Sequence, residues 1–199
     1  MKTILVTAHG FNVRDNGAAT TDRFRPYAEA RGWTMIEADR GFEFLAAARS
    51  RFRNQQRARE IVETATDAAR FDSEPARIIG LGHSDGCRKL LNAAWIRPIF
   101  DRLIFINPAL DSNAPMPPEV ERVDVWHAPG DLAVTFAKCL AFHAWGDMGS
   151  IGYAGKSMRV KNHNAIAVGG KAGFEFPAFR KHSRIFENLD LFGDLILSE

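Results

Sequence analysis

The regular spacing of short apolar runs narrows the folds open to this chain of 199 residues. Five such runs occur, at residues 3–8, 34–38, 77–81, 103–106 and 123–126, and several are continuous rather than alternating. A continuous run of this length is typical of a strand that is buried on both faces of a parallel sheet. Helix-type segments separate the first four runs, and this alternation predicts right-handed βαβ units.

The helix-type segments complete a prediction of fold class. They cover residues 20–31, 54–71, 85–97 and 183–197, and a weaker strand signal covers 157–161. We therefore expect a three-layer α/β/α sandwich around a mostly parallel sheet of five to six strands. The length predicts a single domain over residues 1–199, and its glycine-bearing part around 144–180 is expected to be an irregular excursion.

Composition and charge exclude several classes of partner. The net charge is +2, from 26 basic and 24 acidic residues, which is too balanced to indicate nucleic acid or a membrane surface. An arginine-rich stretch spreads over several helical turns among acidic residues and is typical of a solvated helix face; its members are Arg49, Arg51, Arg53, Arg57 and Arg59.

Targeting and cysteine signals are weak. The N-terminus enters a strand-type run without the pattern of a signal peptide, and no run reaches transmembrane length, so we expect a cytoplasmic protein without a membrane span. Cys87 and Cys139 form no disulfide framework, and Cys87 is predicted to be a buried thiol.

A Gly-x-Ser-x-Gly motif follows the third apolar run. It consists of Gly82, His83, Ser84, Asp85 and Gly86, and a helix-type segment comes directly after it. A strand, a sharp turn and a helix form the context in which this motif exposes a nucleophilic serine. Because the turn is tight, the positions two residues from the serine must lack bulk, which explains both glycines.

A nucleophilic serine needs a base, a group that orients the base, and donors for an oxyanion. The donors are expected to be the backbone N–H groups of Asp85 and Phe11, since His9 and Gly10 stand at the end of the first strand. His9 itself is predicted to be a structural hydrogen-bonding residue.

The acid and the base are expected beyond the strands that follow the motif. Asp131 comes after a strand and a Pro-Gly turn, with Asp111 and Asp124 as alternatives. The histidines that follow it are His143, His163 and His182. We favour His182, because it lies just before the last amphipathic helix, which can anchor it over the sheet edge.

With these four motifs in this order, the chain resembles the α/β-hydrolase superfamily along nearly its whole length. The resemblance is to compact serine esterases and lipases without a lid, because only about sixteen residues separate the fourth and fifth strands. It implies hydrolysis of an ester, thioester or amide of a small-molecule acyl substrate through an acyl-enzyme. Ser84 is then the nucleophile, and no cofactor is needed.

Other functions and contacts follow from the same residues. Asn12, Asn107 and Leu110 follow strands at the active edge and are expected to touch substrate. The alternative function is that of a catalytically inactive α/β-hydrolase-fold binding protein. No metal is expected, because no short-spaced ligand pair occurs among His127, Asp131, His143 and Asp147.

Overall fold

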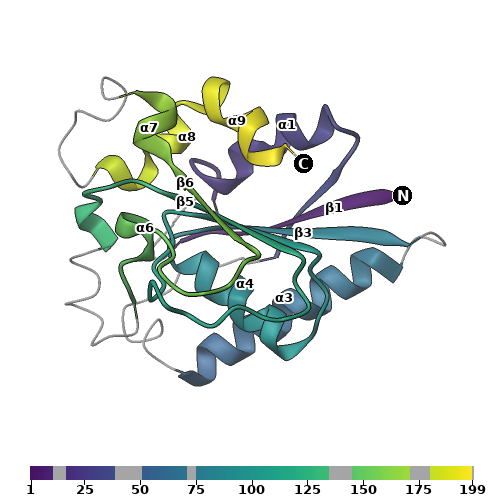
Figure 1. The fold of residues 1–199 in the computed structure, drawn as a ribbon. Coiled ribbons are helices and arrows are strands. Elements are labelled where there is room, and N and C mark those ends of the chain that lie inside the picture. The colour runs from purple at the N-terminus through teal and green to yellow at the C-terminus, as the bar shows by residue number, and fades with distance from the viewer. Residues whose placement is uncertain (11–16, 39–50, 71–74, 135–144, 171–179, 199) are drawn as a thin grey trace.

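The computed structural model describes residues 1–10, 17–38, 51–70, 75–134, 145–170 and 180–198. Six strands form one parallel sheet in the order β2-β1-β3-β4-β5-β6 (Figure 1). The strands are β1 (Lys2–Ala8), β2 (Thr34–Glu37), β3 (Ala76–His83), β4 (Arg102–Ile106), β5 (Arg122–His127) and β6 (Val160–Asn164). The five predicted strands are confirmed, and their carboxyl ends share one edge of the sheet.

Helices cover both faces of the sheet, so the predicted three-layer sandwich is confirmed (Figure 1). One face carries α3 (Arg51–Arg70) and α4 (Asp85–Ile96), whose side chains join an apolar cluster with Ile4, Val6 and Phe105. The other face carries α1 (Arg25–Glu29), α8 (Arg184–Glu187) and α9 (Leu189–Leu197), which pack with Leu5, Ile79 and Ile104 in a second cluster. Alternate residues of the central strands thus enter opposite clusters, as a doubly covered sheet requires.

The sixth strand lies three residues later than predicted. It forms the edge of the sheet beside β5, and its polar sequence leaves its side chains exposed or half-buried. An apolar-run criterion detects buried strands, so it gave this edge strand only a weak signal. Within the segment expected to be irregular, α6 (Met148–Ile151) and α7 (Ala165–Gly169) flank β6. Much of the segment's described part is therefore regular structure, and β6 extends the sheet.

Two predicted helices are interrupted. The segment 20–31 begins with a 3-10 turn, η1 (Thr21–Phe24), before α1. The closing segment, predicted over 183–197, follows η3 (Arg180–Ser183) and is broken between α8 and α9 at Asn188, whose φ of −119° is not helical. The Asn188 side chain donates to the Arg184 carbonyl, 3.0 Å away, and so caps the break. Amphipathic spacing continues through this break, which is why the sequence indicated one helix.

The predicted burial of Cys87 is confirmed. Cys87 is buried in α4, and burial raises the pKa of its thiol well above the usual range, as expected for an inert core residue. Cys139 lies outside the described residues. In the part of the chain that the structure describes, no helix is long and apolar enough to cross a bilayer.

Candidate active site

Ser84 occupies a strained turn between β3 and α4. Its φ of 54° and ψ of −120° lie in a region that residues with a side chain rarely adopt. The turn is held by two backbone hydrogen bonds, from the Ser84 N–H to the Ile106 carbonyl at 3.0 Å and from the Ala109 N–H to the Ser84 carbonyl at 3.1 Å. Ser84 is half-buried, while His83 and Asp85 on either side are buried. The turn therefore presents the serine and hides its neighbours.

Both glycines of the motif are required by close backbone contacts. A Cβ atom on Gly86 would lie 2.2 Å from the Ala8 carbonyl oxygen, and one on Gly82 would lie 2.8 Å from the Cys87 nitrogen. Gly10 approaches the serine itself, since a Cβ atom there would lie 3.0 Å from the Ser84 Cβ. The end of β1 and the start of α4 can thus approach the serine closely only because these positions lack a side chain.

The predicted oxyanion donors are only partly described. Asp85 is the first residue of α4, directly after Ser84, so its N–H belongs to the first turn, whose amides have no partner within the helix. Phe11 and Asn12, predicted as the second donor and as a substrate contact, lie outside the described residues. His9 is buried, and its Nδ1 donates to the Gly10 carbonyl at 2.9 Å, in keeping with a structural role.

His182 and Asp131 are hydrogen-bonded to each other although 51 residues separate them. The Nδ1 of His182 lies 2.7 Å from the Oδ2 of Asp131. A carboxylate only accepts, so the proton of a neutral imidazole lies on Nδ1, and Nε2 is left as the acceptor. That is the tautomer a general base requires.

Asp131 is fully buried, and its two oxygens have separate partners. Oδ1 accepts from the N–H groups of Ala133 and Val134, at 3.0 and 3.4 Å, so the residue also caps the helix that starts at Leu132. Oδ2 accepts from His182 and from the Nδ2 of Asn107, at 2.7 and 3.0 Å. The bonds to Ala133, Val134 and Asn107 therefore fix the orientation of the carboxylate independently of His182.

Two of the residues predicted to touch substrate, Asn107 and Leu110, are buried. Asn107 is fully buried with a φ of 44°, and its amide is committed to Asp131. Leu110 is 6% exposed and joins the apolar cluster beneath α3 and α4. Sequence reasoning missed the Asn107–Asp131 contact, because nothing in the spacing of the two residues indicates it.

His83 connects the turn to His182. Its Nε2 lies 3.0 Å from the His182 carbonyl oxygen, and the two rings are 4.7 Å apart. Burial, together with the charge of His182, lowers the pKa of His83 well below its usual range, so the ring is neutral and donates its Nε2 proton to the carbonyl. His182 is thus anchored to the residue that precedes Ser84. Sequence reasoning assigned no role to His83.

The alternative acids and bases are engaged elsewhere. His163 donates from Nε2 to the Oδ1 of Asp124 at 2.8 Å and stacks on Trp126 with ring centroids 4.5 Å apart. Burial alone would raise the pKa of Asp124, but hydrogen bonds from His163 and Arg122 and the charge of Arg102 lower it to about 2.

Asp111 belongs to a loop. Its side chain accepts from the backbone N–H of Asn113 at 2.8 Å in a local turn. His143 lies outside the described residues. Within the described ranges, no group of three or more His, Cys, Asp or Glu side chains is arranged to hold a metal ion.

Comparison with known proteins identifies the architecture. No family model matches the sequence, and no curated protein matches it either. Solved structures do match. A cutinase-like protein from Cryptococcus sp. aligns over 96% of this chain and 91% of its own at 13% identity, with a TM-score of 0.54. Lipase B from Aspergillus fumigatus aligns over 93% of this chain at 10% identity, with a TM-score of 0.61.

The chain has the α/β-hydrolase fold. It spans 49% of the length of the lipase, so it matches about half of that protein. Within the α/β-hydrolase fold, the described residues place the strained turn with the half-buried Ser84, the His182–Asp131 pair and the glycine-bearing end of β1 along one edge of the sheet. This agrees with the order of motifs from which the sequence predicted the fold.

Proposed function

We propose that the protein is a serine hydrolase that cleaves a carboxylic ester or a related acyl bond. The observation that carries the proposal is the hydrogen bond between His182 and Asp131, combined with the contact that docks His182 on the neighbour of Ser84. The bond to Asp131 leaves the Nε2 of His182 as the acceptor, and the contact with His83 holds His182 next to the turn that carries the serine. Such a pair is what a serine nucleophile requires.

In the proposed mechanism, the Nε2 of His182 takes the proton of the Ser84 hydroxyl as its oxygen attacks the acyl carbonyl carbon. Asp131 holds the imidazole by Nδ1 and stabilises the imidazolium that forms. The N–H groups of Asp85 and Phe11 donate to the oxyanion, each worth about 3 kcal/mol of transition-state stabilisation. His182 then protonates the leaving group, and water, deprotonated by the same nitrogen, releases the acid from Ser84.

Supporting evidence comes from the fold and from its neighbours. The cutinase-like protein and the lipase bear names of ester-cleaving enzymes, and both share the α/β-hydrolase architecture with this chain. The strain at Ser84 is a second support, since backbone strain of this kind costs about 1–3 kcal/mol and concentrates at functional sites.

The test is hydrolysis of p-nitrophenyl acetate and butyrate by the wild-type protein and by Ser84→Ala. We expect turnover in the wild type and none above the uncatalysed rate in the variant. Ser112→Ala is a matched control, because Ser112 is a buried serine in the loop after β4. Equal rates in wild type and Ser84→Ala would refute the proposal.

A further inference from the structure

The side chain that follows the serine is buried among cations. Asp85 is fully buried, and its Oδ1 accepts from the Nε1 of Trp145 at 2.6 Å and from the Nε of Arg88 at 2.8 Å. The Nζ of Lys89 lies 3.8 Å from Oδ2, and the Lys89 side chain is 1% exposed. We call Arg88, Lys89 and Trp145 around this carboxylate the Asp85 clamp.

The Asp85 clamp joins three distant parts of the chain. Arg88 and Lys89 belong to the first turns of α4, and Trp145 precedes α6. Arg88 also donates from Nη2 to the Oδ1 of Asn54 in α3, at 3.0 Å. The turn that carries Ser84 is therefore braced by side chains as well as by its backbone contacts.

The segment that brings in Trp145 is fitted tightly to the loop after β4. A Cβ atom on Gly146 would lie 2.3 Å from the Asp111 nitrogen, and one on Gly149 would lie 2.7 Å from the Asn107 carbonyl carbon. Backbone contacts this close fix the position of the indole, which is 6% exposed. The hydrogen bond from Trp145 thus comes from a rigid support.

A bare carboxylate at this position would oppose the proposed chemistry. The Asp85 side chain belongs to the residue whose N–H is proposed to bind the oxyanion, and like charges repel strongly in a buried site. Arg88 and Lys89 supply two positive charges against one negative charge, and the indole adds a neutral donor. The arrangement offsets the carboxylate charge and prevents its side chain from turning toward the oxyanion.

We propose that Asp85, held by its clamp, is a positioning residue that orients the oxyanion-binding amide of the serine turn. This inference rests on the proposed hydrolase function. It predicts that loosening the clamp weakens binding of the negatively charged transition state and leaves binding of the neutral substrate unchanged. A clamp that served only overall stability would instead alter the melting temperature and leave the kinetics of the folded protein unaltered.

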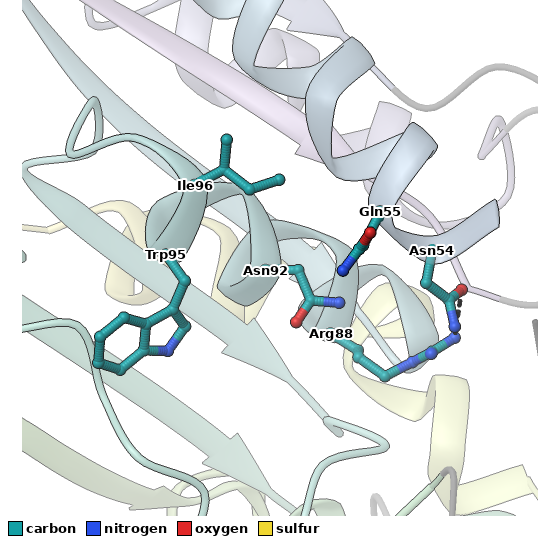
Figure 2. A pocket seen from close by; sticks show the side chains of 6 residues that line it. All are labelled: Asn54, Gln55, Arg88, Asn92, Trp95 and Ile96. Atoms are coloured by element: carbon teal, nitrogen blue, oxygen red, sulfur yellow. Dashed lines mark hydrogen bonds between the residues drawn. The ribbon is translucent and has the colours of Figure 1, made fainter. Parts of the chain in front are cut away.

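A groove gives access to the clamp from solvent. Figure 2 shows Arg88 and Asn54 joined by a hydrogen bond at one end of this groove between α3 and α4. Its volume is about 350 Å³, and its lining residues are Asn54, Gln55, Arg88, Asn92, Trp95 and Ile96. Removing the Arg88 side chain would therefore open a space that a small guanidinium ion can enter from the groove.

The first experiment compares Trp145→Phe with Trp126→Phe. Trp126 is a matched control, because it is also buried and its Nε1 has no hydrogen-bond partner in the described part of the chain. We expect Trp145→Phe to lower kcat about 10-fold at unchanged KM, and to weaken inhibition by phenylboronic acid, whose serine adduct is anionic, by a similar factor. Trp126→Phe is expected to retain wild-type values.

The second experiment is chemical rescue of Arg88→Ala. We expect kcat to fall at unchanged KM and to recover in part with millimolar ethylguanidinium, which should not stimulate the wild type or Trp145→Phe. If the wild type lacks Ser84-dependent hydrolysis, the proposed function fails and this inference with it. If the wild type is active, but Trp145→Phe matches Trp126→Phe in kcat and in boronate affinity, the positioning role alone is overturned.

Discussion

Replacing Asp131 by asparagine is the sharpest perturbation of the proposed mechanism, because each carboxylate oxygen has described partners of its own. Oδ1 accepts from two backbone N–H groups, and Oδ2 accepts from His182 and Asn107. An amide of the same shape can keep only one of these two sets of bonds. Its NH₂ group must face either the helix amides or His182.

The first orientation keeps the hydrogen bonds to the helix amides and changes the tautomer of His182. The NH₂ then donates to Nδ1 of His182, which moves the ring proton to Nε2 and removes the base. Asn107 can accommodate this orientation by turning its own amide, since its Oδ1 has no hydrogen-bond partner among the described residues. Little stability is lost, but the imidazole can no longer accept a proton from Ser84.

The second orientation keeps the productive tautomer of His182, with its proton on Nδ1. It leaves two backbone N–H groups of the helix facing an NH₂ group. Each unsatisfied donor costs about 1–3 kcal/mol, so this orientation lies roughly 2–6 kcal/mol above the first. Even the lower figure leaves only about one molecule in thirty with the productive tautomer. Loss of the charge that stabilises the imidazolium adds to this, and we expect kcat to fall about 10³- to 10⁴-fold.

The assay is steady-state hydrolysis of p-nitrophenyl butyrate, with melting temperatures measured in parallel. Asp111→Asn is the matched control, because Asp111 follows the neighbouring strand and was the alternative acid in the sequence. We expect it to retain the wild-type rate. An Asp131→Asn protein that stays folded and within 10-fold of the wild-type kcat would refute the role of this carboxylate.

Two further predictions concern stability. Ser84→Gly removes the strain of a side chain at φ 54°, and neither Ser84→Gly nor Ser84→Ala should be active. In urea denaturation, the free energy of unfolding of Ser84→Gly should exceed that of Ser84→Ala by about 1–2 kcal/mol. Equal stability of the two variants would argue that the turn stores no strain. The pKa of Asp124 is lowered from 3.8 to about 2, so its ionised carboxylate stabilises the folded state. This stabilisation is fully present above about pH 4 and is lost as the pH falls from about 4 to 2. Asp124→Asn should therefore flatten the decline of stability over that window by about 2 kcal/mol, and an unchanged pH profile would contradict the assignment.

The sequence predicted what depends on local chemistry. Continuous apolar runs marked the five covered strands, and Gly82 and Gly86 marked a turn whose backbone contacts leave no room for a Cβ atom. The edge strand β6 was only weakly signalled because its residues are polar and partly exposed. The break at Asn188 was missed because the apolar spacing continues across it.

Side-chain hydrogen bonds between distant segments could not be predicted from the sequence. The order of motifs indicated Asp131 and His182, but the bonds from Asn107 to Asp131 and from Trp145 to Asp85 join residues that no periodicity links. Asn107 was expected at the substrate because it follows a strand at the active edge. In the structure, Asn107 has a left-handed backbone conformation, and its buried amide donates to the Asp131 carboxylate. Such polar contacts depend on how loops pack, which spacing does not encode.

The claim that Ser84 is a nucleophile activated by His182 is tested most directly by covalent labelling with a fluorophosphonate. Intact-protein and peptide mass spectrometry would follow the rate and the site of a single addition. We predict labelling at Ser84 in the folded wild type, no adduct in Ser84→Ala, and a rate at least 10²-fold lower in His182→Ala. Labelling that persists in Ser84→Ala, or that proceeds at the wild-type rate in His182→Ala, would contradict the account.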